Sequence, residues 1–474
     1  MFLMVIENIN IHESIERVRG LLSKEKDISP ALKAAIEVII MALTLVWSRL
    51  AKNSLNSSKP PSQDPNREKE RRSNGRSRGG QNGHIGQNLK KVDNPDETIE
   101  HKISSCKKCN KDLSSQESEG YEARQVFEVE IKRIVIEHKA EIKTCGDCGV
   151  VNTGKFPEEA SKAVQYGTGV KSLSTYMSLY QLIPYNRVED FFKDQIGLPI
   201  SSGSIYNFNL EAFNKLEEFE KQIKGKLINS AINHSDETGI NINGEKAWLH
   251  SVSNSRWTYF YPHYKRGTEA MKEMGILPKY GGILCHDHWK PYYSYNCTHA
   301  LCNAHHLREL EYVYEEDKQE WAKIMKNFLI ETNDAVNKVG GKLDGVETDK
   351  YRRRYRSILL EGEKECPLPE KEKGKRGRQK KSKSRNLLER LRDYEEDVLI
   401  FMQNKIVPFS NNQAENDIRM TKVQQKISGC FRAMEGAKIF CRVRSYLSTA
   451  RKNSIGSLQA MRMLFMGSLP NFAE

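Results

Sequence analysis

The sequence predicts an α+β protein with several domains, and three observations support this prediction. At 474 residues, the chain exceeds the roughly 250–300 residues beyond which a single hydrophobic core stops growing. Apolar runs typical of strands occur in the middle of the chain, whereas helical spacing of apolar residues prevails before and after them. The net charge of +13 is concentrated in two short segments, so it marks linkers or loops rather than a uniformly basic surface.

Residues 1–55 are expected to be helical. Apolar residues recur every three or four positions on a helix that begins near Pro30, at Ile36, Ile39, Ile40, Leu43, Val46, Trp47 and Leu50. Such a stripe can mediate self-association as a short coiled coil, and packing within the chain explains it at least as well. The stretch is too short for a membrane span and no signal peptide is evident, so we expect a soluble, cytoplasmic protein.

Residues 56–98 are expected to form a basic, flexible linker. Between residues 59 and 91, nine Lys and Arg outnumber three Asp and Glu, and the Pro and Gly residues disfavour regular structure. Because such a segment screens phosphate charge well, its arginines are candidate DNA contacts: Arg71, Arg72, Arg76 and Arg78. A solvated linker that aids solubility is an equally good interpretation.

Residues 99–156 contain two Cys-x-x-Cys pairs, Cys106 with Cys109 and Cys145 with Cys148. In a chain without a secretory signal, paired cysteines more often hold metal than form disulfides. Four thiolates on two tight turns predict a closed, tetrahedral zinc (Zn²⁺) site with a structural role. The segment between the pairs alternates apolar residues up to Ile142, which predicts a strand.

Residues 157–226 have a helical pattern. Within them, the segment from Arg187 through Gly197 to Phe208 resembles a helix-turn-helix, with Pro199 in the turn and Ser201 or Ser202 capping the second helix. DNA binding is one interpretation, and an ordinary helical hairpin is the other.

Residues 227–314 are expected to form the first part of a mixed sheet with helices. Strand-like runs cover residues 229–235, 247–253 and 256–261, a helix covers 268–274, and a fourth strand leads into Asp287. This order is typical of a ribonuclease-H-like α/β core, in which the first and fourth strands are neighbours. Asp236 and Asp287 follow these two strands, so we expect them to meet. A helix from about His299 to Tyr314 is expected to cover the sheet.

Glu415 lies on a predicted helix in residues 406–474, which complete this core with C-terminal helices. Ser410, Asn411 and Asn412 offer N-caps for that helix, and Asn412, Arg419 and Lys422 share the face of Glu415. A carboxylate between an amide and cations can ligate metal while its neighbours hold phosphate. The candidate DNA contacts on this helix are Asn412, Arg419, Lys422 and Lys426.

Residues 315–405 separate Asp287 from Glu415 and are expected to form a helical insertion. It carries a Lys/Arg-rich loop, whose candidate DNA contacts are Arg376, Arg378, Lys380 and Lys381. A Cys/His cluster also surrounds Asp287, and we favour packing over a second zinc site for it. His305, from this cluster, is a candidate phosphate contact.

Several motifs in the same order resemble the insertion-sequence-66 family of bacterial DDE transposases over nearly the whole chain. They are Asn-Ser-Ser-Lys-Pro-Pro-Ser at 56–62, Gly-Gly-Gln-Asn-Gly-His-Ile-Gly at 79–86, the two Cys-x-x-Cys pairs, Asp-Glu-Thr at 236–238, Cys-Asn-Ala-His at 302–305, Asn-Asn-Gln-Ala-Glu at 411–415 and Ser-Tyr-Leu-Ser-Thr-Ala at 445–450. Two features depart from the family pattern: the His-Asp-His-Trp context of Asp287, and Ser410 in place of an acid.

The resemblance implies a catalytic triad of Asp236, Asp287 and Glu415 that depends on Mg²⁺ or Mn²⁺. Such carboxylates can hold two ions about 3.5–4 Å apart, one to activate water and one to stabilise the leaving 3′ oxygen. The implied partners are double-stranded DNA at the element's terminal inverted repeats and at the target, further copies of the chain in the DNA complex, and small accessory proteins. Two alternatives remain: a catalytically inactive repressor derived from a transposase, and a structure-specific nuclease of the same fold.

Overall fold

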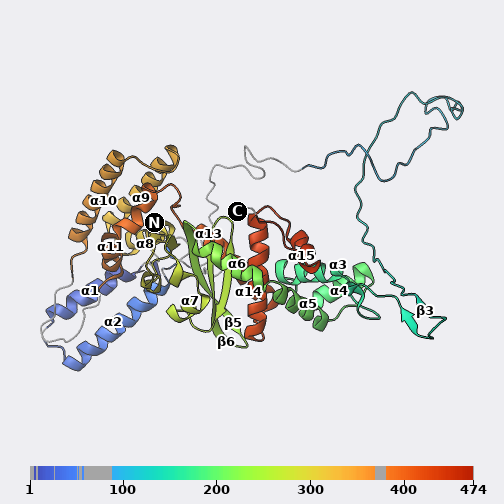
Figure 1. The fold of residues 1–474 in the computed structure, drawn as a ribbon. Helices are drawn as coiled ribbons and strands as arrows, with labels where there is room; N and C mark the ends of the chain where they lie inside the picture. The colour runs from blue at the N-terminus through green and yellow to red at the C-terminus, as the bar shows by residue number, and fades with distance from the viewer. Residues whose placement is uncertain are drawn as a thin grey trace.

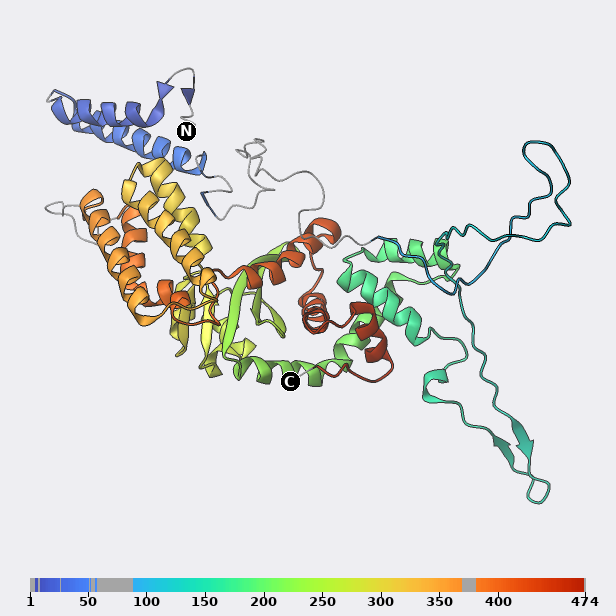
Figure 2. The ribbon, with the colours of Figure 1, turned by 90° about the horizontal axis from the view of Figure 1, so that it is seen from above.

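A five-stranded mixed sheet forms the centre of the protein. The computed structural model describes residues 5–6, 9–25, 27–50, 52, 56–57, 88–368 and 381–472. The sheet consists of β5 (Ile232–Ile242), β6 (Glu245–Ser253), β7 (Thr258–His263), β8 (Ile283–His286) and β9 (Thr298–Leu301). Figures 1 and 2 show this sheet between two groups of helices.

The strands are arranged in the order β7-β6-β5-β8-β9. β5, β6 and β7 form antiparallel pairs, joined first by a tight turn at Asn243 and Gly244, both with positive φ. Asn-Gly suits such a two-residue hairpin because both turn positions need positive φ. The chain then crosses through α7 (Thr268–Met274) and adds β8 and β9 in parallel to β5. The first and fourth strands are therefore neighbours, as the sequence predicts.

Two local expectations were wrong. β5 does not end before Asp236 but continues to Ile242, because the hairpin with β6 supplies backbone partners along its whole second half. A fifth strand, β9, occupies the start of the expected covering helix, and α8 begins only at Asn303 and ends at Asp317. A four-residue strand such as β9 shows too little periodicity to be recognised in sequence, and its parallel pairing with β8 decides its conformation.

Helices that precede and follow the sheet in the sequence cover the side of the sheet that includes β7. They are α3 (Thr168–Thr175), the π-helical turn η3 (Tyr176–Tyr180), α4 (Tyr185–Ile196), α5 (Ser202–Lys215), α6 (Glu217–Ile228), α14 (Met434–Lys452) and α15 (Ser457–Phe465). The edge strand β7 is protected by α14, since Ser445 Oγ accepts from Phe260 N (2.9 Å) and Thr449 Oγ1 from Thr258 N (3.2 Å). These bonds satisfy backbone groups that an open sheet edge would expose.

The helical hairpin that resembles a helix-turn-helix is α4 and α5. Gly197 ends α4 with a φ of 64°, a left-handed conformation that glycine adopts without strain. Ser201 caps α5 by accepting a hydrogen bond from Ser204 N over 3.1 Å.

The other group of helices follows β9 in the chain. It contains α8, α9 (Glu320–Lys338), α10 (Gly345–Glu365), α11 (Lys383–Asp393) and α12 (Glu395–Leu399). These helices share a second core, which includes the fully buried Trp321. β8 contributes to both cores, since Leu284 packs into the first and Cys285 into the second. α13 (Asn412–Ser428) then returns the chain to the sheet.

Two helices and a mostly irregular segment precede this body. α1 (Ile11–Lys24) and α2 (Pro30–Leu50) pack through Ile15, Leu22 and Ile40, while Ile39, Leu43 and Val46 stay exposed. Residues 121–140 form no strand, contrary to the alternating pattern, because no strand among the described residues pairs with them. In this segment β3 (Ile142–Thr144) pairs with β4 (Val151–Thr153), and Ser105 forms an isolated bridge with Asp112. None of the helices in the described ranges has the length and hydrophobicity to cross a membrane.

Candidate active site

The register between β5 and β8 brings Asp236 to the level of Asp287. His234 is paired with Cys285 in this parallel ladder, so continuing it by two residues sets Asp236 opposite Asp287, which directly follows β8. Neighbouring strands lie about 4.8 Å apart, and alternate residues share a face of the sheet. The main-chain N–H of Trp289 donates to Asp287 Oδ1 over 3.0 Å, which fixes this carboxylate after the strand ends.

Asn411 fastens the start of α13 to the same place. Its side-chain amide donates to the carbonyl of Ser235 (2.9 Å), its Oδ1 lies 2.8 Å from His234 Nδ1, and its main-chain N–H donates to Cys302 Sγ (3.1 Å). Asn411 stands at the N-cap position, but its side chain caps nothing. It instead connects α13 to β5 and to the residue after β9. Glu415 follows one helical turn later, its N–H bonded to the carbonyl of Asn411.

The three acids act on one another electrostatically. Burial raises the pKa of Asp236 well above its ordinary value, and the negative charges of Glu237, Asp287 and Glu415 raise it further. Buried carboxylates that repel one another favour either a proton or a cation, because both relieve the repulsion. Asp236 therefore lies within electrostatic reach of Asp287 and Glu415, but in the described part of the chain the ligand atoms of these three acids do not form a group within 4.8 Å of one another. A divalent-cation site made by the three stays a prediction.

Glu415 of α13 faces Cys302 and His305, which lie at the start of α8. Ligand atoms of Cys302, His305 and Glu415 all lie within 4.8 Å of one another. Glu415 Oε1 lies 3.9 Å from both His305 Nε2 and Arg308, too far for hydrogen bonds. Among the described residues, Glu415 Oε1 and His305 Nδ1 are buried without hydrogen-bond partners.

These unpaired atoms test whether the donor set fits a metal. A buried carboxylate oxygen without a donor is unfavourable unless a cation or water satisfies it. Carboxylate oxygens are the ligands that Mg²⁺ prefers, so Asp236, Asp287 and Glu415 fit divalent ions of this kind. Burial is the main cause that lowers the pKa of His305, and the charge of Arg308 lowers it further, so the imidazole is neutral near pH 7.

Glu237 and Tyr292 belong to the site although the sequence did not single them out. The Tyr292 hydroxyl donates to Glu237 Oε2 over 2.7 Å, and Arg266 pairs with Glu237 Oε1 at 2.6 Å. Arg266 also lies over the rings of Trp289 and Trp248. These contacts join β5 to the loop after Asp287. The one signal in the sequence was that Glu237 is an acid next to Asp236. Its contacts with Tyr292 and Arg266 depend on the folded structure, because these residues are distant in sequence.

The other members of the Cys/His cluster pack rather than gather around a metal. His286 Nε2 lies 3.0 Å from His299 Nδ1, and the rings of His288 and His299 rest on Tyr293. Within the described ranges, the only candidate ligand group in this cluster is Cys302 and His305 with Glu415. This agrees with the packing interpretation for the remainder.

The candidate DNA contacts have different surroundings. On α13, Asn412, Arg419 and Lys426 are exposed, whereas Lys422 Nζ donates to the carbonyl of Gly239 over 2.6 Å. Lys381 is paired with Glu389 at 2.7 Å and is not a free cation. Seven further candidates lie outside the described residues: Arg71, Arg72, Arg76, Arg78, Arg376, Arg378 and Lys380.

Each Cys-x-x-Cys pair forms a tight turn. The N–H groups of Cys109 and Lys108 lower the pKa of the Cys106 thiol, and those of Cys148 and Asp147 do the same for Cys145. Main-chain donors aimed at sulfur favour the thiolate, which is the form that binds metal. In the described part of the chain, the four sulfur atoms do not form a group of three or more within 4.8 Å. A shared zinc ion therefore stays a prediction.

The five-stranded mixed sheet and its flanking helices are compatible with a ribonuclease-H-like core, the class of fold expected of a DNA-processing enzyme. The model of the Transposase IS66 family matches residues 163–439, more than half of the 474 residues. The chain therefore belongs to this transposase family, as its resemblance implied. A second match, to a family of unknown function (DUF6444), covers residues 6–90. Comparison with curated proteins gives no match.

Proposed function

We propose that this transposase binds the terminal inverted repeats of an insertion sequence, cleaves at its ends and joins the 3′-hydroxyls to target DNA. The observation that supports the proposal is the register of β5 and β8, which sets Asp236 level with Asp287, together with the effect of the charges of Asp287 and Glu415 on Asp236. These carboxylates would hold two Mg²⁺ or Mn²⁺ ions. When bound, such ions activate the attacking oxygen and stabilise the leaving 3′ oxygen.

The chain's own residues prepare this chemistry. Asp236, with its raised pKa, gives up its proton when a cation replaces it, so cation binding and deprotonation are coupled. Asn411 fixes where Glu415 enters the site. His305 and Arg308 lie beside Glu415, where a donor and a positive charge suit a phosphate oxygen of the bound strand.

DNA would be held by contacts that do not depend on base identity. The exposed side chains of Asn412, Arg419 and Lys426 follow one another along α13, the helix that carries Glu415. The basic segments add a salt-sensitive attraction to phosphate, and the Cys pairs and the α4–α5 hairpin are the candidate readers of the ends. Further copies of the chain and small accessory proteins are expected in the DNA complex, since the two ends must be processed together.

The test uses purified protein, duplexes carrying the sequences that flank this reading frame, and Mg²⁺. We expect cleavage and strand joining by wild type, and binding without cleavage by Asp236→Asn, Asp287→Asn and Glu415→Gln. Glu245→Gln is the matched control, because Glu245 is an exposed acid at the far end of the β5–β6 hairpin. Wild-type cleavage by any triad variant would remove that acid from the mechanism, and cutting without joining would favour a nuclease.

A further inference from the structure

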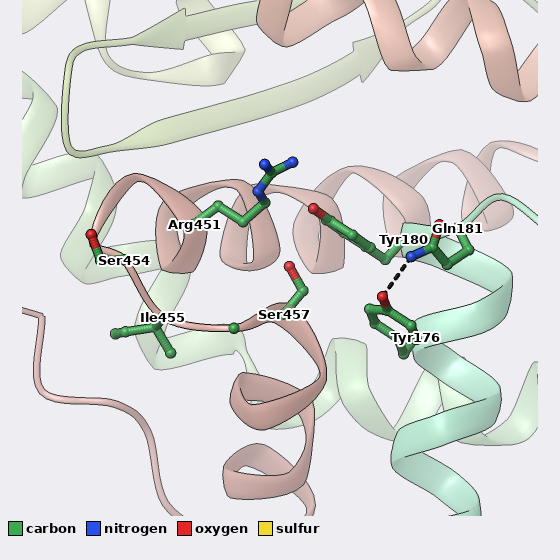
Figure 3. A pocket seen from close by; sticks show the side chains of 8 residues that line it. Tyr176, Tyr180, Gln181, Arg451, Ser454, Ile455 and Ser457 are labelled. Atoms are coloured by element: carbon green, nitrogen blue, oxygen red, sulfur yellow. Dashed lines mark hydrogen bonds between the residues drawn. The ribbon is translucent and has the colours of Figure 1, made fainter. Parts of the chain in front are cut away.

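A second polar hollow lies outside the acidic site, where η3 meets the junction of α14 and α15. It is an open depression of about 460 Å³, lined by Tyr176, Tyr180, Gln181, Arg451, Ser454, Ile455, Gly456 and Ser457. Figure 3 shows the Ser457 hydroxyl pointing into the space between Arg451 and Tyr180. Arg451, Ser454 and Gly456 are exposed at its rim, so a large ligand can reach it.

Ser457 is the first indication of a ligand. Its side chain is 7% exposed, and its hydroxyl is buried without a hydrogen-bond partner among the described residues. A buried hydroxyl left unpaired costs about 1–3 kcal/mol, so such groups usually face a water or a ligand. This hydroxyl lines the hollow, and a ligand there can pair with it.

The start of α15 is the second indication. α15 begins at Ser457, and no side chain caps it. The first N–H groups of a helix have no partner within the helix, and their dipoles favour a bound anion. The hydroxyl of Ser457 therefore lies beside backbone donors that suit an oxyanion.

Arg451 supplies a positive charge at the same place. No carboxylate in the described ranges pairs with Arg451, while its neighbour Lys452 pairs with Asp417 of α13 at 2.7 Å. A second guanidinium, that of Arg444, lies over the Tyr180 ring at 4.8 Å and donates to the Tyr180 carbonyl over 2.9 Å. Arg451 is thus the cation that lines the hollow, and the lining residues include no acid.

We propose that this hollow binds a phosphate of the DNA backbone through Arg451, Ser457 and the N-terminus of α15. Arg is suited to phosphate because its planar guanidinium donates two parallel hydrogen bonds. The stacked rings of Tyr176 and Tyr180, with centroids 5.3 Å apart, offer a wall for the attached sugar. The Lys452–Asp417 pair connects the hollow to the helix that carries Glu415, so a strand held here is fixed relative to the acidic site.

This inference rests on the proposed function, because it takes DNA as the source of the phosphate. The test measures binding of the full chain to a mixed-sequence duplex at several salt concentrations. We expect Arg451→Gln to weaken binding ~10-fold and to lower the salt slope by about one. Ser457→Ala should weaken binding several-fold while its unfolding temperature stays the same or rises, because no bond within the protein is lost. Arg462→Gln, an exposed arginine of α15 outside the hollow, is the matched control.

A parallel measurement adds inorganic phosphate at constant ionic strength. If phosphate raises the unfolding temperature of wild type but not of Ser457→Ala, and all variants bind the duplex equally, the hollow is a free-phosphate site and the DNA proposal is wrong. Equal duplex binding by all variants, with wild-type cleavage intact, overturns this inference alone. A wild-type chain that binds no duplex overturns the proposed function and this inference together.

Discussion

The side-chain amide of Asn411 donates a hydrogen bond to the main-chain carbonyl of Ser235 over 2.9 Å, which joins the third acid's helix to the first acid's strand. Asn411 is 2% exposed and touches no acid of the triad by any bond of its side chain. We therefore predict that Asn411 positions Glu415 relative to Asp236.

Replacing Asn411 by Ala should reduce cleavage by roughly 10²-fold, because small displacements of a catalytic group have effects of that size. DNA affinity should stay close to wild type. The Mg²⁺ concentration for half-maximal cleavage should rise, which a loss of stability alone would not cause. Asn416→Ala, at an exposed position of the same helix, is the control. Unchanged Mg²⁺ dependence in Asn411→Ala would mean that Asn411 has a structural role only.

Asp236 should destabilise the metal-free protein near pH 7. Because its pKa is raised in the folded state, its contribution to stability is greatest below its ordinary pKa and is lost as the pH rises toward the folded-state value. With a chelator at about pH 7, Asp236→Asn should therefore unfold at a higher temperature than wild type, and the difference should shrink near pH 4. Calorimetry with and without Mg²⁺ checks this, since added Mg²⁺ should raise the unfolding temperature of wild type only.

The two Cys pairs should hold one zinc ion per chain between them. Elemental analysis should find that ion in wild type and lose it in Cys145→Ser, because three thiolates bind zinc more weakly than four. Cys430→Ser is the control, since Cys430 is exposed and distant in sequence from both pairs. Full zinc content in Cys145→Ser, or none in wild type, would show that the pairs do not share a structural ion.

Gly282 should tolerate no side chain. A Cβ there would lie 2.6 Å from the carbonyl oxygen of Ser230 and 2.8 Å from that of Ala231, in the segment that leads into β5. Gly282→Ala should lower the free energy of unfolding by at least about 1–3 kcal/mol, because backbone atoms must move. Gly281→Ala is the matched control, with nothing within 4 Å of its Cβ, and should change stability by no more than ~0.5 kcal/mol. Urea denaturation of both variants separates the two cases.

The sequence predicted the middle of the fold well because its signals there were local. Strand-like runs, the helix at 268–274 and the order of the elements all came from short apolar patterns, and α7 has the expected bounds. The position of Asp236 level with Asp287 followed from the strand order. The end of β5 could not be predicted from the strand order, since the length of this strand depends on its pairing with β6 across the Asn243–Gly244 turn.

What the sequence missed depends on contacts between distant segments. β9 is too short for its own pattern, and Glu237 gains its meaning from Tyr292 and Arg266, 55 and 29 positions away. Lys381 looked like a free cation in a basic run, but its pairing with Glu389 requires the start of α11. The exposed segment between the Cys pairs was predicted as a strand and is irregular, since a strand-like pattern forms no strand without a partner strand.

The helices between β9 and α13 also delay the translation of Glu415 relative to that of Asp287. Asp287 and Glu415 are 128 positions apart (415 − 287), which a ribosome translates in roughly 6–26 s at about 5–20 residues per second. During that interval the nascent chain contains Asp236 and Asp287 but lacks Glu415. If the proposed function holds, we expect a chain that ends in this stretch to retain candidate DNA contacts but to lack the third proposed catalytic acid, and therefore to compete with intact copies for DNA without cleaving it.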